Sequence, residues 1–155
     1  MMHLAPPQAS PKFIAESALA TPEGWLFVDD KTMQHKKFNN VFGLGDVAQL
    51  PTAKTGAAIR KQAPVVVANL LKMIENNTIT NKTYDGYSSC PLVTGYGKMV
   101  LAEFDYSKEF KPDPKLKQFP MLIDDSSKEH WRLWILKKYL LPYLYWNKMM
   151  KGVNV

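Results

Sequence analysis

Apolar residues in the first half of the chain fall into two short runs and one long periodic segment. The runs Trp25–Val28 and Val41–Gly45 are continuous, which predicts short strands, the second of them buried on both faces. Gly56–Asn76 instead repeats its apolar residues with the spacing of a helix, and Pro51–Thr55 supplies helix-start signals before it. Pro64 falls inside this segment. We expect it to kink or divide the helix, because its ring removes an amide and clashes with the preceding turn.

The second half of the chain changes to a strand-like and then to a helical pattern. Tyr84–Tyr106 is rich in β-branched and aromatic residues, which predicts two strands joined near Gly95–Gly97. A final helix is predicted to start at Ser126, whose hydroxyl would cap it while Glu129, three residues later, completes a capping box. Pro142 should divide that helix in two.

Length and composition limit the kinds of protein that this chain can be. Its 155 residues, 46% of them hydrophobic, suit a packed domain rather than a disordered segment. A single cysteine excludes a disulfide framework and a multi-cysteine zinc site, and the three histidines lie too far apart for helical metal-ligand spacing. We therefore predict no metal site. No apolar run approaches the roughly 20 residues that a membrane-spanning helix needs.

The net charge of +6 comes mostly from the end of the chain. Residues 127–155 hold six Lys and Arg residues against one Glu, and they also hold three of the four Trp residues. An aromatic, basic helix of this kind can lie on an anionic membrane surface. An ordinary amphipathic helix packed on a sheet is the alternative. Nucleic acid is not predicted as a partner, because the segment is too apolar for a face that tracks phosphates.

One segment has the pattern of a ligand site. Gly45 and Asp46 end the second predicted strand, which would place a carboxylate at the sheet edge where α/β folds bind ligands, within reach of a ribose or ribityl hydroxyl. The next helix would begin with unpaired amides at Thr55–Ala57. Gly56 would let a flat ligand approach the backbone, and Lys54 adds positive charge, so negative charge on the bound group would be favoured. A plain strand-to-helix turn, in which the Asp and Thr only cap, explains the same spacing.

Cys90, in the stretch Ser88–Pro91, is the single cysteine and admits two interpretations. A free cysteine is most often buried and inert. It becomes reactive where a positive charge lowers its pKa, and a Lys could do this in space although no acid–base partner adjoins it in sequence.

Three stretches of the sequence resemble known flavoproteins. Asn40–Asp46 followed by Leu50–Ala58 resembles the second flavin-binding motif of flavoproteins with two dinucleotide-binding domains, and Tyr84–Tyr96 narrows the resemblance to the sulfide:quinone oxidoreductases. The likeness runs along nearly the whole chain and is greatest to the branch that contains the mitochondrial enzymes. It implies an α/β fold: the C-terminal part of an FAD/NAD(P)-binding Rossmann-like flavoprotein, with a β-hairpin region and C-terminal amphipathic helices.

The resemblance also implies a division of the chain. Residues 1–40 would form the end of the second nucleotide-binding domain and the crossover segment that follows it. Residues 41–80 would supply the closing strand and helix of the FAD-binding domain. Residues 81–155 would form the hairpin and the helices at a membrane and quinone interface. Family members are about two to three times as long, as expected for chains with two nucleotide-binding domains. The first dinucleotide fingerprint, Gly-x-Gly-x-x-Gly, does not occur in this sequence. We therefore expect a C-terminal portion of the enzyme that is inactive alone.

The resemblance implies a role for individual residues. Gly45 and Asp46 would bind FAD, with Asp46 on its ribityl chain, and Lys54–Ala57 would lie near the pyrimidine edge of the isoalloxazine ring and stabilise reduced, anionic flavin. Cys90 would be one of two redox-active cysteines: sulfide attacks the pair, a persulfide forms, and a thiolate passes two electrons to FAD, which reduces quinone. Tyr143 and Tyr145 could line the quinone channel. The enzyme would be a peripheral protein of the bacterial cytoplasmic membrane or the mitochondrial inner membrane.

Two alternatives stay open. One is a related FAD-dependent reductase of the flavocytochrome c sulfide dehydrogenase or NADH:quinone reductase type, although hydride transfer from NADH needs no cysteine. The other is a non-enzymatic module that binds a membrane surface. The sequence does not decide whether the protein forms a homo-oligomer.

Overall fold

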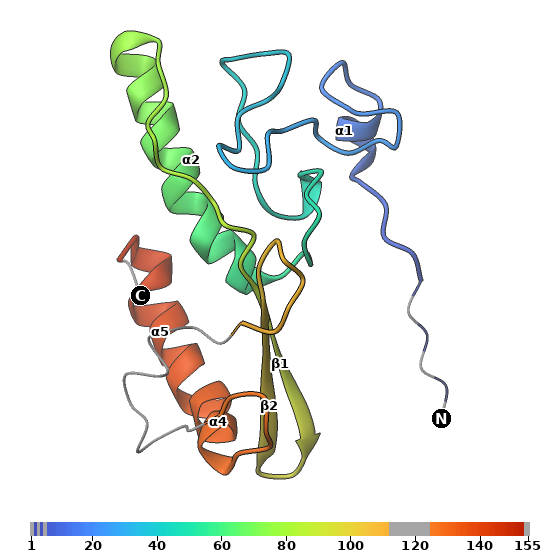
Figure 1. Ribbon diagram of the computed structural model, residues 1–155, viewed down its shortest axis with the longest axis vertical. Helices are drawn as coiled ribbons and strands as arrows, with labels where there is room; N and C mark the ends of the chain where they lie inside the picture. The colour runs from blue at the N-terminus through green and yellow to red at the C-terminus, as the bar shows by residue number, and fades with distance from the viewer. Residues whose placement is uncertain (1, 3, 5, 112–124, 154–155) are drawn as a thin grey trace. The chain divides into compact units, whose positions relative to one another are not determined.

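The computed structural model describes residues 2, 4, 6–111 and 125–153 and combines helices with one two-stranded sheet (Figure 1). The chain divides into two compact units, Met1–Ser88 and Ser89–Val155. A doubly wound sheet of the Rossmann type is not present among the described residues.

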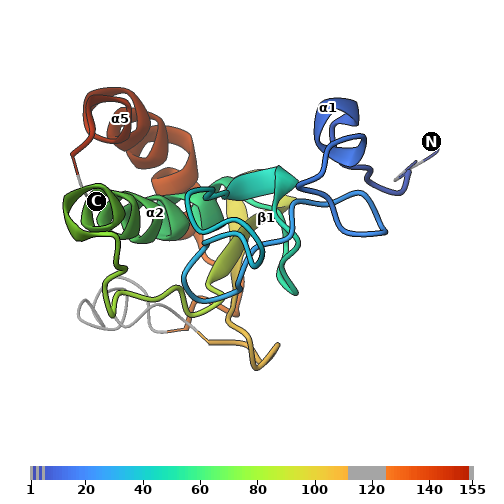
Figure 2. The same ribbon diagram turned by 90° about the horizontal axis from the view of Figure 1, so that it is seen from above.

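The first unit consists of loops between two helices of very different length. Helix α1 (Lys12–Ala15) and helix α2 (Gly56–Asn76) lie on opposite sides of the loops that connect them, and η1 (Gly45–Val47) is a single 3₁₀ turn between (Figures 1 and 2). Side chains of Leu26, Val28 and Ala48 form the core of the loop region.

The two strands predicted in this unit are not continuous strands. Residues 25–28 and 41–45 form only isolated bridges, which join Leu26 to Ala20 and Ala48, Val28 to His35, and Phe42 to Gln34. The prediction that 41–45 is buried on both faces is also wrong, since Gly43 alone in that run is fully buried. A buried parallel strand needs a long neighbour on each edge, and here the neighbours are short turns of the same unit.

Helix α2 begins and ends where the pattern predicts. The Thr55 hydroxyl caps its first turn by accepting a hydrogen bond from the Ala58 nitrogen at 3.2 Å, and Asn77 ends it in the left-handed conformation with φ 56°. Pro64 lies inside the helix without dividing it. Its ring costs the helix about 3 kcal/mol, and the burial of Val65 and Val66 beside it offsets that cost.

The second unit contains the hairpin that the sequence predicts. Strand β1 (Ser88–Gly95) pairs with β2 (Lys98–Phe104), and Gly97 takes a positive φ of 73° in the turn between them. One face of β2 is buried and the other is more exposed. Met99 and Leu101 on the buried face pack against Leu133 of the following helix.

The C-terminal helix starts later than predicted. Helix α4 (Trp131–Ile135) is capped by His130, whose Nδ1 accepts a hydrogen bond from the Arg132 nitrogen at 3.2 Å, so the predicted capping box of Ser126 and Glu129 is wrong. The His130 nitrogen donates to the Met99 carbonyl at 3.0 Å. This hydrogen bond holds His130 in an extended conformation, so the helix begins only at Trp131.

Pro142 changes the type of helix rather than breaking it. A π-helical segment, η2 (Leu136–Leu140), follows α4 and leads directly into α5 (Leu141–Asn147), with Pro142 in the first turn of α5. A proline in a first turn needs no amide partner, which is why the helical course continues to the 3₁₀ turn η3 (Met149–Lys151). Within the described parts of the chain, no helix is both long and apolar enough to span a membrane.

Candidate functional site

The loop that carries Asp46 is fixed to helix α2 by a buried side chain. Gly45 has a positive φ of 72°, and its nitrogen donates a hydrogen bond to Oε1 of Gln62 at 2.8 Å. Gln62 is 2% exposed. Asp46 itself lies exposed on η1, so its carboxylate is open to a ligand, although it follows an irregular segment rather than the end of a regular strand.

Several of the predicted residues line one small hollow in front of helix α2. Gly45, Lys54 and Thr55 share this hollow, whereas Asp46, Gly56 and Ala57 are not part of its wall. The other lining residues come from the connecting loop and the first turns of α2: Leu50, Thr52, Ala53, Ala58 and Gln62. The structure therefore brings together three of the six residues predicted to bind a cofactor, and the other three adjoin them in sequence.

Lys54 is the charged residue of this hollow, and its ammonium group is held in place. Nζ donates a hydrogen bond to the Ala48 carbonyl at 2.6 Å and lies 4.1 Å from the centre of the Trp25 ring. Burial lowers the pKa of Lys54 below its usual value, and the nearby Asp46 carboxylate acts in the opposite direction. Neither Trp25 nor Ala48 was predicted to belong to the site, because the contacts that bring them there join separate turns.

The first turn of helix α2 offers backbone amides and open space. Thr55 caps the helix, so this part of the capping interpretation is confirmed. The amides of Gly56 and Ala57 precede the first hydrogen bond within the helix and lie at the positive end of its dipole. A methyl group built on Gly56 would have no atom within 4 Å. The fold does not require glycine here, and these residues fit a flat group that carries negative charge.

Cys90 lies on strand β1 of the second unit and is an exposed, free thiol. The interpretation of a buried, inert cysteine therefore does not fit the structure. Nζ of Lys137, in the π-helical segment, donates a hydrogen bond to the carbonyl of the next residue, Pro91, at 2.9 Å. This lysine lies 46 positions from Pro91, and sequence reasoning missed it because no local pattern links the two.

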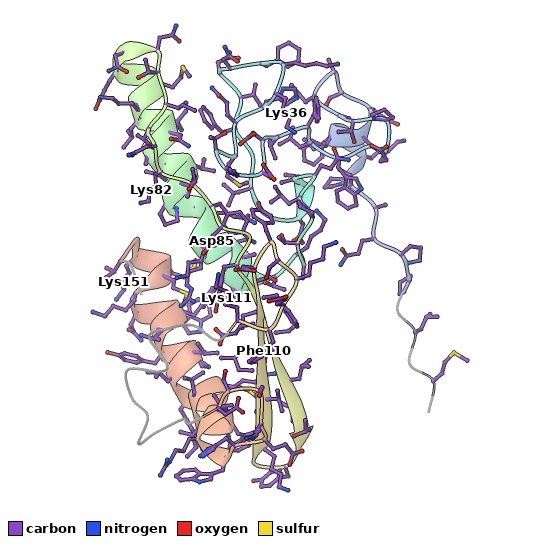
Figure 3. The ribbon with its side chains drawn as sticks, in the orientation of Figure 1. Lys36, Lys82, Asp85, Phe110, Lys111 and Lys151 are labelled. Carbon is purple, nitrogen blue, oxygen red and sulfur yellow. The ribbon has the colours of Figure 1, made fainter. Side chains whose placement is uncertain are left out.

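The aromatic tail is exposed over most of its length. Helix α4 packs on the hairpin through Leu133, as an ordinary amphipathic helix would. The outer side chains of the tail are largely exposed, including both predicted quinone residues, and Lys151 projects at its end (Figure 3). The most exposed aromatic ones are Trp131 (56%), Tyr139 (60%), Tyr143 (57%), Tyr145 (45%) and Trp146 (65%).

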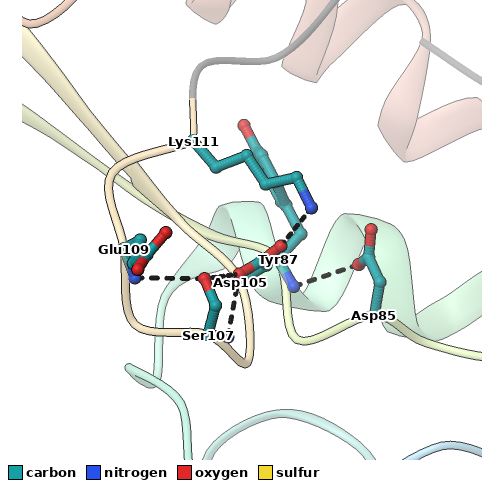
Figure 4. Close-up of polar contacts among 6 residues, drawn as sticks. All are labelled: Asp85, Tyr87, Asp105, Ser107, Glu109 and Lys111. Carbon is teal, nitrogen blue, oxygen red and sulfur yellow. Dashed lines mark hydrogen bonds and ion pairs between the residues drawn. The ribbon is translucent and has the colours of Figure 1, made fainter.

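A polar network closes the loop that follows β2. The Asp105 carboxylate accepts hydrogen bonds from the nitrogen and the hydroxyl of Ser107 at 2.9 and 2.6 Å and pairs with the Lys111 ammonium (Figure 4). The Lys111 contact and the Ser107 bonds lower the pKa of Asp105 to about 2. The described residues hold no group of three or more His, Cys, Asp or Glu residues that could bind a metal ion, and we interpret this network as a loop closure.

Curated relatives match nearly the whole of the chain. It is 43% identical over 152 residues to "Sulfide:quinone oxidoreductase, mitochondrial" of Mus musculus, 46% identical over 153 residues to the protein of that name from Dictyostelium discoideum, and 44% identical over 147 residues to that from Schizosaccharomyces pombe. These matches cover 98, 98 and 95% of this chain but 32, 32 and 31% of the relatives. The chain thus spans about a third of their length.

A solved structure is similar as well. A chain in the cryo-EM structure of the Tetrahymena thermophila mitochondrial ATP synthase, an F1Fo composite tetramer, is 38% identical and has a TM-score of 0.62. The match covers 68% of this chain and 25% of that chain. No model of a protein family matches this sequence.

Proposed function

Because this chain belongs to the sulfide:quinone oxidoreductase family, we propose that it forms the C-terminal portion of an enzyme that oxidises sulfide and reduces quinone. The observation that carries the proposal is the identity of 43–46% to curated members along at least 95% of the chain. The chain would contribute one flavin-binding segment, one redox-active cysteine and a membrane-facing helix. Since it spans about a third of those relatives, we propose that the enzyme is complete only in a longer protein.

The segment from Asp46 to Ala57 would hold FAD. The exposed Asp46 carboxylate would accept hydrogen bonds from hydroxyls of the ribityl chain. The amides of Gly56 and Ala57 would stabilise negative charge on the ring, because they lie at the positive end of the helix dipole, and the Lys54 ammonium would add a full positive charge nearby. FAD, when bound, supplies a two-electron acceptor. The open space at Gly56 supports this placement, since a flat ring could lie close to the backbone there.

Cys90 would carry the sulfur chemistry. It is exposed on strand β1, as an attack by dissolved sulfide requires. In the proposed step, hydrosulfide attacks a disulfide between Cys90 and a partner cysteine, so that the S–S bond breaks, one cysteine becomes a persulfide and the other leaves as a thiolate. That thiolate then holds the electron pair that passes to the acceptor. This chain has one cysteine, so the partner cysteine would lie elsewhere in the longer protein.

The helical tail would place the enzyme at a membrane. Its exposed aromatic residues and its basic residues suit an anionic lipid surface, and Tyr143 and Tyr145 could line the path of the quinone. The word "mitochondrial" in the relatives' names supports the mitochondrial inner membrane over the bacterial membrane. Those names also support a sulfide:quinone oxidoreductase over the other flavoenzymes and over a non-enzymatic module.

The experiment that tests the function replaces Cys90 in the full-length protein. We expect Cys90→Ser to keep the yellow colour and FAD absorbance of the wild type and to abolish sulfide-dependent bleaching of the flavin. Val93→Thr, on the exposed part of the same strand, is the matched control and should bleach at the normal rate. Normal turnover by Cys90→Ser, or a wild-type protein without flavin, would overturn the proposal.

A further inference from the structure

The ammonium group of Lys54 is held from two directions. The Ala48 carbonyl accepts one of its N–H groups at 2.6 Å, and the Trp25 ring centre lies 4.1 Å from Nζ. An ammonium group has three N–H donors. The Ala48 carbonyl accepts one of them, one side of the group faces the Trp25 ring, and the lysine itself is part of the wall in front of helix α2.

Trp25 is itself fixed by its backbone. Its carbonyl accepts a hydrogen bond from the Thr21 nitrogen at 2.7 Å. The next residue, Leu26, is buried in the core and pairs through its backbone with Val47 and Gln49 on either side of Ala48. The ring and the carbonyl that hold Lys54 are therefore connected through one short set of backbone hydrogen bonds.

A lysine side chain has four rotatable carbon–carbon bonds, so the ammonium group of an exposed lysine would occupy many positions. Indole is the aromatic ring that attracts a cation most strongly. The contact with Trp25 therefore restricts the ammonium to one region in front of helix α2. Burial lowers the pKa of Lys54, and the Asp46 carboxylate acts in the opposite direction.

We propose that Trp25 is a positioning residue that holds the Lys54 ammonium where it stabilises negative charge on the reduced flavin. The proposal rests on the proposed function, because it takes FAD as the group in front of helix α2. Trp25 need not touch the flavin. It acts through the place and the charge of Lys54, and so it should change the reduction potential and the affinity of FAD more than it changes the stability of the fold.

The test compares four variants of the full-length protein: Trp25→Leu, Trp25→Phe, Lys54→Met and Phe27→Leu. Phe27 is the matched control, since its ring lies 5.2 Å from Nζ of another lysine, Lys36, outside the hollow. The readouts are the midpoint potential of the bound flavin and the dissociation constant of FAD after flavin removal. A third readout, in the flavin-free protein, is the proton NMR shift of the Lys54 methylene next to Nζ, which the indole ring current moves upfield.

Trp25→Leu should make the midpoint potential more negative, in the same direction as Lys54→Met, and should weaken FAD binding about fivefold, the size of one exposed cation–π contact. It should also remove the upfield shift of Lys54. Trp25→Phe should keep most of each property, and Phe27→Leu should leave the potential and FAD affinity unchanged. If Trp25→Leu kept the midpoint potential, the FAD affinity and the Lys54 chemical shift of the wild type, the role of Trp25 would be overturned while the proposed function would stand. If Lys54→Met also had no effect, or if the wild type bound no FAD, the assignment of the flavin segment would fail with it.

Discussion

The side chain of Gln62 accepts a hydrogen bond from the backbone nitrogen of Gly45, 17 residues earlier in the chain, at 2.8 Å. Gln62 is buried on helix α2, and Gly45 begins the turn that carries Asp46. A single side chain thus connects the exposed carboxylate proposed to bind the ribityl chain with the helix whose first amides are proposed to face the ring. We expect the geometry of the proposed flavin segment to depend on this hydrogen bond.

Replacement of Gln62 should loosen that segment. Gln62→Leu keeps the apolar stem but removes the acceptor, which leaves the Gly45 nitrogen unpaired and should destabilise the chain by about 1–3 kcal/mol. FAD affinity of the full-length protein should fall with it. Gln62→Glu retains an acceptor oxygen at the same place and should restore much of the affinity. Urea unfolding and FAD titration measure the two effects. If Gln62→Leu and Gln62→Glu had the same free energy of unfolding and the same FAD affinity, the hydrogen bond to Gly45 would not contribute to either.

Two glycines in the same region should respond in opposite ways to alanine. A methyl group on Gly43 would lie 2.0 Å from Cδ2 of the buried Leu26 side chain, so Gly43→Ala should cost about 1–3 kcal/mol through overpacking. Gly56 has open space around the same position, so Gly56→Ala should leave the stability of the chain equal or slightly higher. Thermal unfolding of both variants tests these expectations.

The second variant also tests the flavin placement. If a flat ring lies against the backbone at Gly56, the methyl group of Gly56→Ala would obstruct it, and FAD should bind more weakly although the fold is intact. Unchanged FAD affinity in Gly56→Ala would show that the ring does not approach this residue. Gly43→Ala cannot give this pattern, because its effect on FAD would follow its effect on stability.

Acid should weaken the loop closure at Asp105. Its pKa is lowered to about 2, first by the side chain of Lys111 and then by Ser107, whereas in the unfolded chain an Asp carboxyl has a pKa of about 3.9. The folded state therefore binds this proton less readily than the unfolded state. The stabilisation is fully present above about pH 4 and is lost as the pH falls through about 2.

The measurement is the free energy of unfolding from pH 5 down to pH 2, for the wild type and for Asp105→Asn. The difference between them should be constant near pH 5 and should shrink as the pH falls, because the wild type loses its ionised carboxylate. Lys111→Met should shift the wild-type curve toward that of Asp105→Asn, since the pKa of Asp105 would rise. Parallel curves for all three proteins would contradict the assignment.

Local patterns predicted the parts of the fold that local interactions stabilise. Helix α2 has the predicted bounds because a threonine caps one end and an asparagine in the left-handed conformation ends the other. The hairpin was predictable because Gly97 occupies the turn at positive φ. The start of α4 was not predictable, since His130 is held extended by a bond to Met99, 31 residues earlier.

The candidate site divides in the same way. In the first unit, motifs predicted Asp46 and Lys54, whereas Trp25 and Gln62 contact that region through distant parts of the sequence. In the second unit, a motif predicted Cys90, whereas Lys137 contacts the neighbouring Pro91 from 46 positions away. The predicted strands failed for a related reason. Their apolar residues were correctly expected to pack, since Leu26 and Val28 are buried, but pairing depends on neighbours that a pattern of single residues does not specify.

The exposed tail should bind anionic lipid through both its rings and its charges. Lys138 lies 4.6 Å from the Trp134 ring centre, and Lys138 and Lys148 are both exposed. Each basic residue near an anionic surface contributes about 1 kcal/mol, so the double variant Lys138→Gln/Lys148→Gln should bind vesicles with anionic lipid about thirtyfold more weakly. Binding to neutral phosphatidylcholine vesicles should change little. Co-sedimentation over a range of lipid concentrations measures both.

The apolar part of the same interaction is tested by Tyr139→Glu and Trp146→Glu, which remove rings that are 60 and 65% exposed. Both should weaken binding to neutral as well as anionic vesicles, because the rings enter the interface whatever the headgroup charge. The matched control is Phe13→Glu, which changes an aromatic side chain that is 73% exposed on α1, and it should bind like the wild type. A protein whose binding is reduced equally by all three glutamate variants would be attracted to lipid by charge alone. Deletion of residues 127–155 without loss of binding would remove the tail from the membrane interaction.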